Sequence, residues 1–565
     1  KIWQDRTGQN KKGHLHLARY MEILFRAFQF RLTFGSAIKE TFRAGYGFKD
    51  FKSDLLAGVI VAMVAIPLGM ALAIAVGVPP EYGLYTIIFA APIAALVGGS
   101  RYQVTGPTAA FVVILAPVVS KFGLGGLLTA TLMAGVLLVL MSLMSLGKAI
   151  QFIPNPVTTG FTSGIAVVIA TIQVKDFFGL QISHMPESYI DRIIALAENF
   201  NSFSIQEFIV AFATLLGLIL WPKINKKIPA PVVILNLAAL GVWIAQSIHP
   251  ELHIATIANK FTPVIDGITF HGIPQMLPSL DWPWHLPGPR GEILIFDWHL
   301  IKALLPSAVA IALLGAIESL LSAVVADAMT GKYHQPDSEL LGQGLANIVG
   351  PFFGGIAATG AIARTATNIR YGAKSPLASV VHSLFVLMAV LFFARLVGYL
   401  PMAALSALLI LVAYNMSDYK HFLHIAKVAP RSDVVVLLTV FALTILFDMV
   451  TGVTVGMVAA SLLLIRKVYM LTSAKQLFFP GHHYHNIPLN KNVQVYEING
   501  PMLFGAAERA VAALSEEKND IDTLIFILED VPVIDYSGLV ALETAVSEFR
   551  NNKGNEKNKV ILVGL

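Results

Sequence analysis

Long apolar segments alternate with short polar ones over the first 471 residues of this chain. Many of the apolar segments approach the roughly 20 residues that a helix needs to cross a bilayer. We predict seven membrane spans, a polar loop, and then seven more spans. The first set is 54–78, 82–99, 106–122, 124–146, 150–174, 206–222 and 228–246; the second is 298–326, 338–353, 361–370, 376–398, 401–416, 433–452 and 453–471.

The composition is typical of an integral membrane protein. Hydrophobic residues make up 56% of the 565 residues, charged residues 13%, and the mean hydropathy is +0.69, whereas soluble domains carry about 25% charged residues. The absence of cysteine excludes disulfides, thiolate metal sites and a cysteine nucleophile. In a soluble chain the net charge of +5 would suggest a nucleic-acid partner. Here the basic residues are explained by cytoplasmic loops, and we expect no nucleic-acid partner.

Lysine and arginine are concentrated in alternate loops, which predicts the orientation in the membrane. With the basic, amphipathic N-terminal segment inside, the inside loops hold bases such as Arg101, Lys148, Lys332, Lys420 and Arg466, and the outside loops hold mainly acids. This segment does not have the pattern of a secretory signal. An even number of spans then returns the C-terminus to the cytoplasm.

Seven spans is an odd number, so the second set crosses the membrane in the opposite sense to the first. Inverted repeats of this kind are common in secondary transporters, whose sites lie where matching spans are broken by Gly or Pro. The third span of each half is broken, at Gly106–Pro107 and at Gly360. We interpret each as an extended strand that turns into a half-helix at mid-depth, which is tolerable only where it lines a cavity. The facing helix N-termini would attract an anion.

Arg364 lies in the first turn of the second half-helix, in the run TGAIARTATN. An ionisable residue at membrane depth is a functional hypothesis by default, and a guanidinium group suits carboxylate or sulfate oxygens. The alternative is a structural arginine that snorkels or pairs with a buried acid.

Glu318 is the candidate coupling residue, because a carboxylate buried among helices can carry a proton. Together with Ser322, one turn further on, it could instead hold Na⁺. The alternative is a static ion pair with Arg364. Asp327 and Asp448 are weaker candidates, and a lone histidine such as His382 is more often a satisfied packing residue.

The composition changes from about Asn490, where strand-like and amphipathic helical segments alternate. These segments predict a small α/β module. Asp535 and Ser537 lie at the start of a predicted helix, where they can serve as an N-cap or a regulatory site. We expect the chain to end partway through this module.

Two long runs carry a family resemblance: PPEYGLYTIIFAAPIAALVGGSRYQVTGPTAAF in the first half, and DSELLGQGLANIVGPFFGG followed by TGAIART and YGAKSP in the second. They resemble the SulP sulfate-permease family of anion transporters, and VPVIDYSGLVAL resembles the STAS domain. The resemblance implies a seven-plus-seven fold with core and gate domains, a homodimer, a cytoplasmic STAS domain with a possible regulatory protein partner, and a bacterial inner-membrane location. The substrate site that it implies comprises Pro67, Leu68, Ala71, Thr105, Gly106, Pro107, Thr108, Ala109, Thr359, Ala361, Ala363, Arg364 and Thr365.

Two departures from the family pattern bear on the substrate. Leu68 stands where many members have Gln, and Ala363 stands where a hydroxyl often precedes the arginine. A roomier and less polar site suits an anion with a carbon backbone. The pattern looks most similar to the bacterial C4-dicarboxylate members, which import succinate, fumarate or aspartate with protons. A proton- or sodium-coupled bicarbonate or sulfate transporter stays open as the alternative.

Two other classes of function are weaker readings of the sequence. A passive anion channel has no need of a coupling acid. An enzyme is not expected, because there is no metal-ligand cluster, nucleophile–base pair or phosphate loop, and the glycines of GQGLANIVG serve close helix packing. We expect no cofactor or metal apart from coupling H⁺ or Na⁺.

The predicted parts are a basic N-terminal segment (1–53), the first repeat (54–246), an extracytoplasmic loop (247–297), the second repeat (298–471), a linker (472–489) and a partial STAS domain (490–565).

Overall fold

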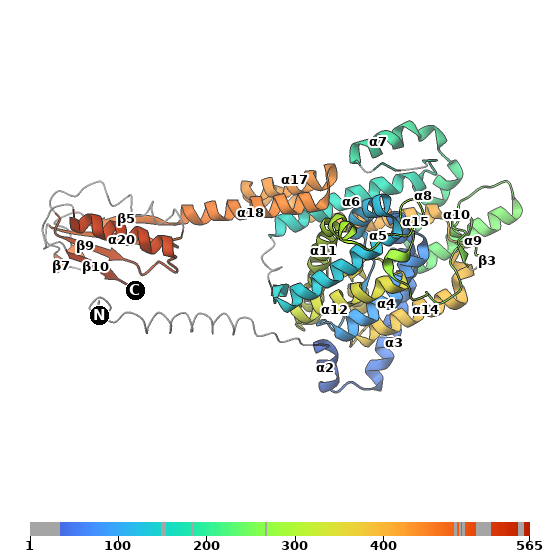
Figure 1. The fold of residues 1–565 in the computed structure, drawn as a ribbon, viewed down its shortest axis with the longest axis horizontal. Helices are drawn as coiled ribbons and strands as arrows, with labels where there is room; N and C mark the ends of the chain where they lie inside the picture. The colour runs from blue at the N-terminus through green and yellow to red at the C-terminus, as the bar shows by residue number, and fades with distance from the viewer. Residues whose placement is uncertain are drawn as a thin grey trace. The chain divides into compact units, whose positions relative to one another are not determined.

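The computed structural model describes residues 34–148, 154–182, 185–186, 188–225, 227–265, 268–478, 483–484, 487–488, 492–503, 521–551 and 559–564. The chain divides into two compact units, Lys1–Thr454 and Val455–Leu565. The first unit is helical and the second is built on a β-sheet (Figure 1). Each unit is therefore described by itself.

The helical unit contains the predicted spans in the predicted order. Its first half is α2 (Ser36–Arg43), α3 (Phe48–Val76), α4 (Pro80–Val97), β1 (Thr105–Gly106), α5 (Ala109–Leu143), α6 (Asn155–Phe177), α7 (Tyr189–Glu198), η2 (Phe200–Ser202), α8 (Ile205–Ile224) and α9 (Ala230–Ile248). The connecting segment holds α10 (Ile257–Lys260), β2 (Val264–Ile265), β3 (Ile268–Thr269) and η3 (Pro283–His285). The second half is α11 (Trp298–Thr330), α12 (Pro336–Val349), η4 (Gly350–Phe353), β4 (Thr359–Gly360), α13 (Ile362–Arg370), α14 (Leu377–Val397), α15 (Met402–Ser417), α16 (Tyr419–Val428) and α17 (Arg431–Leu446). The last predicted span is α18 (Met449–Leu471), within which the division between the two units falls.

Ten helices in the described part of the chain are long and apolar enough to cross a membrane. The remaining predicted spans are the short helices α12, α13 and α17, and one half of α5, which is two helices joined at Gly123. Gly123 has a φ of 69°, and a Cβ there would overlap the backbone of Gly288. The break therefore falls between the predicted spans 106–122 and 124–146.

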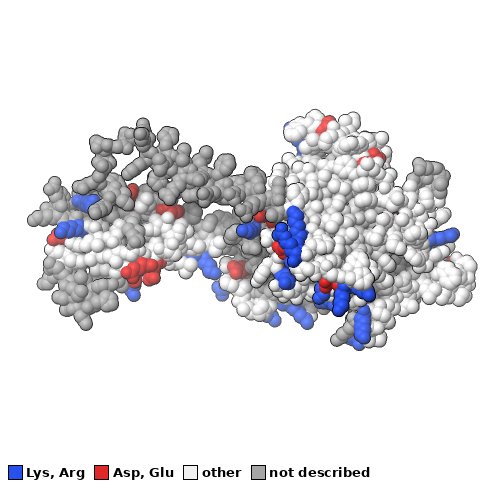
Figure 2. All heavy atoms as spheres, turned by 90° about the horizontal axis from the view of Figure 1, so that it is seen from below, with Lys and Arg blue, Asp and Glu red and all other residues white. Residues whose placement is uncertain are grey.

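The spans form two groups, as the core-and-gate organisation requires. In the first group α3 packs on α14, α4 packs on α12 and α14, and α5 packs on α11 and α12. In the second group α6 packs on α15 and α17, and α8 packs on α9 and α15. Figure 2 shows that one face of the helical unit is largely white, with most of the charged side chains toward its edges. Such a surface suits a lipid environment.

Helix packing in the core group depends on glycine, as the sequence predicts for GQGLANIVG. A Cβ at Gly344 of α12 would lie 2.8 Å from the Val139 nitrogen and 2.9 Å from the Gly135 oxygen of α5. Gly342 meets the backbone of Gly98 in the same way. Small residues let helix backbones approach closely within membranes, and these contacts hold α12 against α4 and α5.

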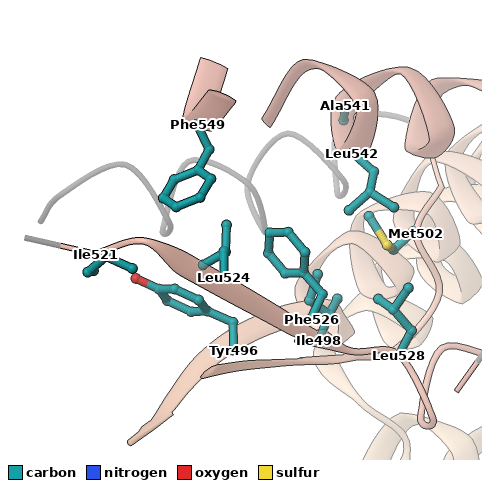
Figure 3. Close-up of a cluster of buried hydrophobic side chains, with 10 residues drawn as sticks. All are labelled: Tyr496, Ile498, Met502, Ile521, Leu524, Phe526, Leu528, Ala541, Leu542 and Phe549. Atoms are coloured by element: carbon teal, nitrogen blue, oxygen red, sulfur yellow. The ribbon is translucent and has the colours of Figure 1, made fainter. Parts of the chain in front are cut away.

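The second unit is a four-stranded sheet covered by a helix. The strand order is β10 (Lys559–Val563), β9 (Thr523–Ile527), β8 (Val493–Asn499) and β5 (Ser473–Phe478), with only β5 antiparallel to its neighbour; β6 (His483–Tyr484) and β7 (Ile487–Pro488) form a separate pair. Side chains from α20 (Tyr536–Asn551), among them Leu542 and Phe549, face Leu524 and Phe526 of the sheet (Figure 3). This is the predicted α/β module.

The described structure differs from the predicted organisation at two boundaries and in two short helices. Residues 473–478, expected in the linker, form β5 because their extended backbone completes the edge of the sheet beside β8. The first span begins at Phe48 rather than at residue 54, since Gly47 precedes a first turn in which Asp50 accepts a hydrogen bond from the Gly47 N–H. The amphipathic helices α7 and α16 lie in segments expected to be loops.

We expect Gly344→Ala to destabilise the helical unit by about 1–3 kcal/mol, since the added methyl group overpacks a helix crossing. The measurement is the thermal unfolding midpoint of the purified full chain in detergent. Gly241→Ala is the matched control, because no atom lies within 4 Å of a Cβ at that position in α9. Equal midpoints for the two variants would show that the α5–α12 contact is not tight.

Candidate functional site

The two broken spans meet through their strands. β1 and β4 pair antiparallel, with Thr105 opposite Gly360 and Gly106 opposite Thr359. Beyond the pair, the Ala361 N–H donates to the Val104 carbonyl at 2.9 Å. The pairing ends after Gly106 because Pro107 has no N–H to donate. The predicted pair of strand-to-half-helix segments is therefore present, and the two segments bond directly to each other.

A helix begins immediately after each strand. α5 starts at Ala109 and α13 at Ile362, and neither N-cap residue, Thr108 or Ala361, caps its helix with a side-chain hydrogen bond. The first-turn N–H groups of both helices thus keep their capacity to bind. Two helix N-termini at one strand pair form a positive region suited to an anion.

Arg364 lies across this strand pair. Its side chain is only 2% exposed, and its Nη2 donates to the Pro107 carbonyl oxygen. Within the described residues its Nε and Nη1 have no hydrogen-bond partner. A Cβ at Gly106 would overlap Nη1, so the glycine makes room for the guanidinium group. A buried guanidinium with two unused donors is poised to bind oxygen atoms.

Glu318 reaches the other side of the same junction. Its Oε2 accepts a hydrogen bond from the Thr108 hydroxyl at 2.7 Å, and its side chain is half-buried. In the described part of the chain Glu318 forms no ion pair with Arg364, so the static pair considered above is not formed. The acid and the base are instead held by consecutive residues, Thr108 and Pro107.

Neighbouring residues of α11 fix the two half-spans in place. Ser319 lies 2.8 Å from the Thr359 hydroxyl and accepts from the Gly360 N–H at 3.1 Å. Ser322 donates to the Thr365 hydroxyl at 3.1 Å, and that oxygen also accepts from the Val104 N–H at 3.1 Å. The Ser322 hydroxyl is thus directed to Thr365 of α13 and is not hydrogen-bonded to Glu318 in the described structure. Its contacts do not favour a shared sodium site.

The predicted residues of the first span lie on α3, which packs against both α5 and α13. Pro67 and Ala71 are buried and Leu68 is half-buried. Pro67 also lines a cavity of about 280 Å³ between α3, α9 and α14. On α13, Ala363 is exposed. Leu68 and Ala363 are thus apolar side chains on α3 and α13 that are not fully buried.

The secondary candidates have other contacts. Asp327 pairs with His334 at 2.6 Å, and Asp448 accepts from the Thr451 N–H and hydroxyl at the start of α18. Asp535 accepts from the Gly538 N–H at 2.7 Å, which is the N-cap role considered for it, and Ser537 is exposed. His382 is fully buried, but neither ring nitrogen has a hydrogen-bond partner among the described residues. Its burial agrees with the expected packing role.

Sequence reasoning missed the buried polar residues that support the site. Glu339 of α12 accepts from the Gly99 and Ser100 N–H groups at 3.0 and 2.9 Å. Gln343 donates to Glu339 and, at 2.7 Å, to the Thr105 hydroxyl of β1. The available signal was the set of polar residues at i, i+4 spacing in DSELLGQGLAN, which alone does not identify their partners.

Asp54, near the start of α3, is another acidic side chain that accepts hydrogen bonds from the backbone of a distant segment. Its carboxylate accepts from the Lys374 and Ser375 N–H groups, the Ser375 hydroxyl and the Tyr46 hydroxyl. It thereby ties α3 to the turn between α13 and α14. Burial and the Asp54 carboxylate together raise the pKa of Tyr46, which lies before α3.

Comparison with known proteins agrees with this architecture. Residues 51–440 match the model of the sulfate permease family, and residues 484–564 match the STAS domain. The chain is 38% identical over 527 residues to "Putative sulfate transporter YvdB" of Bacillus subtilis, covering 92% of this chain and 93% of that protein. It is 28% identical over 543 residues to "Bicarbonate transporter BicA" of Picosynechococcus sp., covering 92% and 89%.

Two solved structures show the same fold. The transmembrane domain of a cyanobacterial bicarbonate transporter, BicA, aligns with a TM-score of 0.60 at 26% identity, covering 74% of this chain and 98% of that one. The overall structure of SLC26A9 aligns with a TM-score of 0.77 at 18% identity, covering 97% and 89%. The second likeness concerns the fold alone.

The inverted repeat, with its paired broken spans, defines this protein as a multi-pass membrane transporter of anions. The chain belongs to the sulfate permease family and carries a STAS domain. These relatives are named for sulfate and bicarbonate, so the comparisons do not support the resemblance to dicarboxylate carriers. The inner-membrane location, the orientation of the termini, the homodimer and a STAS partner stay predictions.

We expect Arg364→Ala to weaken anion binding by more than about tenfold, because one charge-assisted hydrogen bond contributes about 1.5–3 kcal/mol. Binding is measured as the shift in thermal unfolding midpoint on adding bicarbonate, sulfate or succinate. Arg370→Ala is the matched control, since Arg370 is the exposed arginine at the end of the same helix. Unchanged binding by the Arg364 variant would refute an anion site at the β1–β4 junction.

Proposed function

We propose that this protein takes up bicarbonate together with a monovalent cation, by alternating movement of the core group against the gate group. One observation carries the proposal: Thr108 binds the Glu318 carboxylate while the preceding residue, Pro107, binds the Arg364 guanidinium. A cation-binding group and an anion-binding group therefore share one segment of a broken span. Inverted-repeat transporters bind substrate and coupling ion at such segments.

The balance of charge at the junction gives a reason for coupling. The Arg364 charge and two helix N-termini, each equivalent to roughly half a positive charge, attract an anion. An ionised Glu318 opposes that attraction from the same junction. A proton or Na⁺ bound to Glu318 neutralises the carboxylate and so removes its repulsion of the anion. Binding of the cation therefore increases the affinity of the junction for the anion. By thermodynamic reciprocity the anion increases affinity for the cation to the same degree.

The supply of full charges at the junction, as distinct from the partial charges of the helix dipoles, favours a singly charged anion. Among the lysines and arginines of the described residues, Arg364 is the one whose hydrogen bond places it at the junction. A sulfate or dicarboxylate dianion would keep a second negative charge in a site of low dielectric, which is costly without a further partner. Bicarbonate carries a single charge, and its planar carboxylate matches the fork of a guanidinium group. The likeness to proteins named bicarbonate transporters supports this choice.

A C4-dicarboxylate is the second candidate, and a specific observation favours it. Leu68 is half-buried and Ala363 is exposed, where polar side chains are common in the family pattern. Apolar neighbours would suit the carbon chain of succinate, fumarate or aspartate. Under this alternative the second carboxylate needs an additional cation or a second proton.

Uptake of labelled bicarbonate into proteoliposomes tests the proposal. We expect an inward Na⁺ or proton gradient to stimulate uptake, and unlabelled bicarbonate to compete better than sulfate or succinate. Liposomes without protein and liposomes with the Arg364→Ala variant are the controls. Gradient-driven uptake of labelled succinate, with none of bicarbonate, would replace this proposal by the dicarboxylate alternative.

We expect Glu318→Gln to keep anion exchange but to lose accumulation driven by the cation gradient, because the amide cannot bind a proton or neutralise Na⁺. Exchange and accumulation are measured in the same vesicles. Glu251→Gln, at an exposed acid in the segment after α9, serves as the control. Accumulation that survives in the Glu318 variant would show that this carboxylate is structural.

A further inference from the structure

A polar cavity of about 540 Å³ lies at the end of the helical unit where α6 ends and α8 begins. It is lined from four directions: the end of α6 and the segment after it, the first turn of α8, the segment from α9 to α10, and the start of α15. The charged residues of its lining are Lys175, Asp176, Glu207 and Lys260. None of the residues assigned to the β1–β4 junction lines it.

Glu207 is the residue of this cavity that lacks a full set of partners. It is only 7% exposed, and its Oε1 accepts from the Ala255 N–H at 2.6 Å. Its Oε2 has no hydrogen-bond partner among the described residues. A buried carboxylate oxygen left unpaired is unfavourable. Oε2 itself has almost no exposed surface, so a donor in the cavity reaches the carboxylate when the Glu207 side chain turns toward it.

The backbone around Glu207 allows its side chain to lie against the segment that follows α6. Gly179 has a φ of 64°, and a Cβ there would lie 2.8 Å from the Cβ and Cγ of Glu207. Ser204, the N-cap of α8, accepts from the Glu207 N–H and donates its own N–H to the Phe178 carbonyl. These contacts place the carboxylate beside the segment after α6.

Two ammonium groups line the same cavity. Lys260 pairs with Asp176 at 3.1 Å, and Lys175 donates to the Ile182 carbonyl. An ammonium group has three donors and no acceptor, so each lysine keeps the capacity to bind a further oxygen. The cavity therefore combines an unpaired acceptor with donors that can bind an anionic group.

We propose that this cavity binds a small zwitterion, whose ammonium group donates to the Glu207 carboxylate and whose own carboxylate accepts from Lys260 and Lys175. A simple anion would leave Glu207 unpaired, and a simple cation would leave the lysine donors unused. The described residues contain no group of three His, Cys, Asp or Glu able to hold a metal ion. The volume falls within the roughly 300–1,000 Å³ typical of small-molecule sites.

The site would act on the gate group, because its lining comes from α6, α8 and α15, which pack together there. A bound zwitterion would join the ends of these helices through contacts that the empty cavity lacks. A ligand that binds one arrangement of the gate helices better than another shifts the population toward it. The site is thus placed to influence transport without contacting the transported anion.

Thermal unfolding of the purified full chain in detergent tests the site with four probes at millimolar concentration. Glycine and 4-aminobutyrate carry both charges at different separations, whereas acetate and methylammonium carry one each. We expect at least one zwitterion to raise the unfolding midpoint of the Arg364→Ala variant, in which the anion site at the junction is removed, and neither single-charge probe to do so. No shift with either zwitterion, or an equal shift with methylammonium, would overturn the proposal.

Variants then assign the binding to this cavity. Glu207→Gln and Lys260→Met should each raise the dissociation constant of the effective zwitterion by about tenfold or more, the loss expected for one charge-assisted hydrogen bond. Lys260 is partly exposed, so its variant keeps the test valid if the Glu207 variant does not fold. Arg364→Ala should leave zwitterion binding unchanged. Wild-type affinity in both cavity variants, or loss of binding in the Arg364 variant, would refute the assignment.

Discussion

The architecture depends on the pairing of two short strands within the core group of helices. Backbone N–H and C=O groups at membrane depth must be satisfied by the protein itself, and a single broken span cannot satisfy its own. β1 and β4 solve this for each other, with two residues from each repeat. The break in one repeat therefore requires the break in the other. Because each span is broken, α5 and α13 begin within the core group, directly after β1 and β4.

A framework of buried polar side chains fixes the paired strands β1 and β4 relative to the helices around them. Gln343 connects Glu339 to Thr105, and Asn347 exchanges hydrogen bonds with the backbone of Ala358 just before β4. Ser319 bonds both residues of β4 from α11. Each of these side chains has at least one partner from another element, so removing one leaves an unpaired buried group, which is the costly case. The strands are thereby fixed relative to α11 and α12.

The sequence was sufficient for the spans, the two breaks and the presence of Arg364 and Glu318 at one junction. The spans can be predicted from the lengths of the apolar segments, and the breaks can be predicted from the positions of Gly and Pro. The partners of individual side chains were not predictable, because they depend on helix rotation and on contacts between residues hundreds of positions apart. Ser322 bonds to Thr365 rather than to Glu318 for this reason. The amphipathic helices α7 and α16 were missed because they are too short and polar to give a span signal.

The consecutive positions of Pro107 and Thr108 have a consequence for the energetics of the transport cycle. Under the proposed function, the segment that holds the anchors of both ions would carry the cation and the anion across the membrane together. One univalent cation with one univalent anion makes that step electroneutral, so the membrane voltage would neither drive nor oppose it. The direction and extent of accumulation would then depend on the two concentration ratios alone.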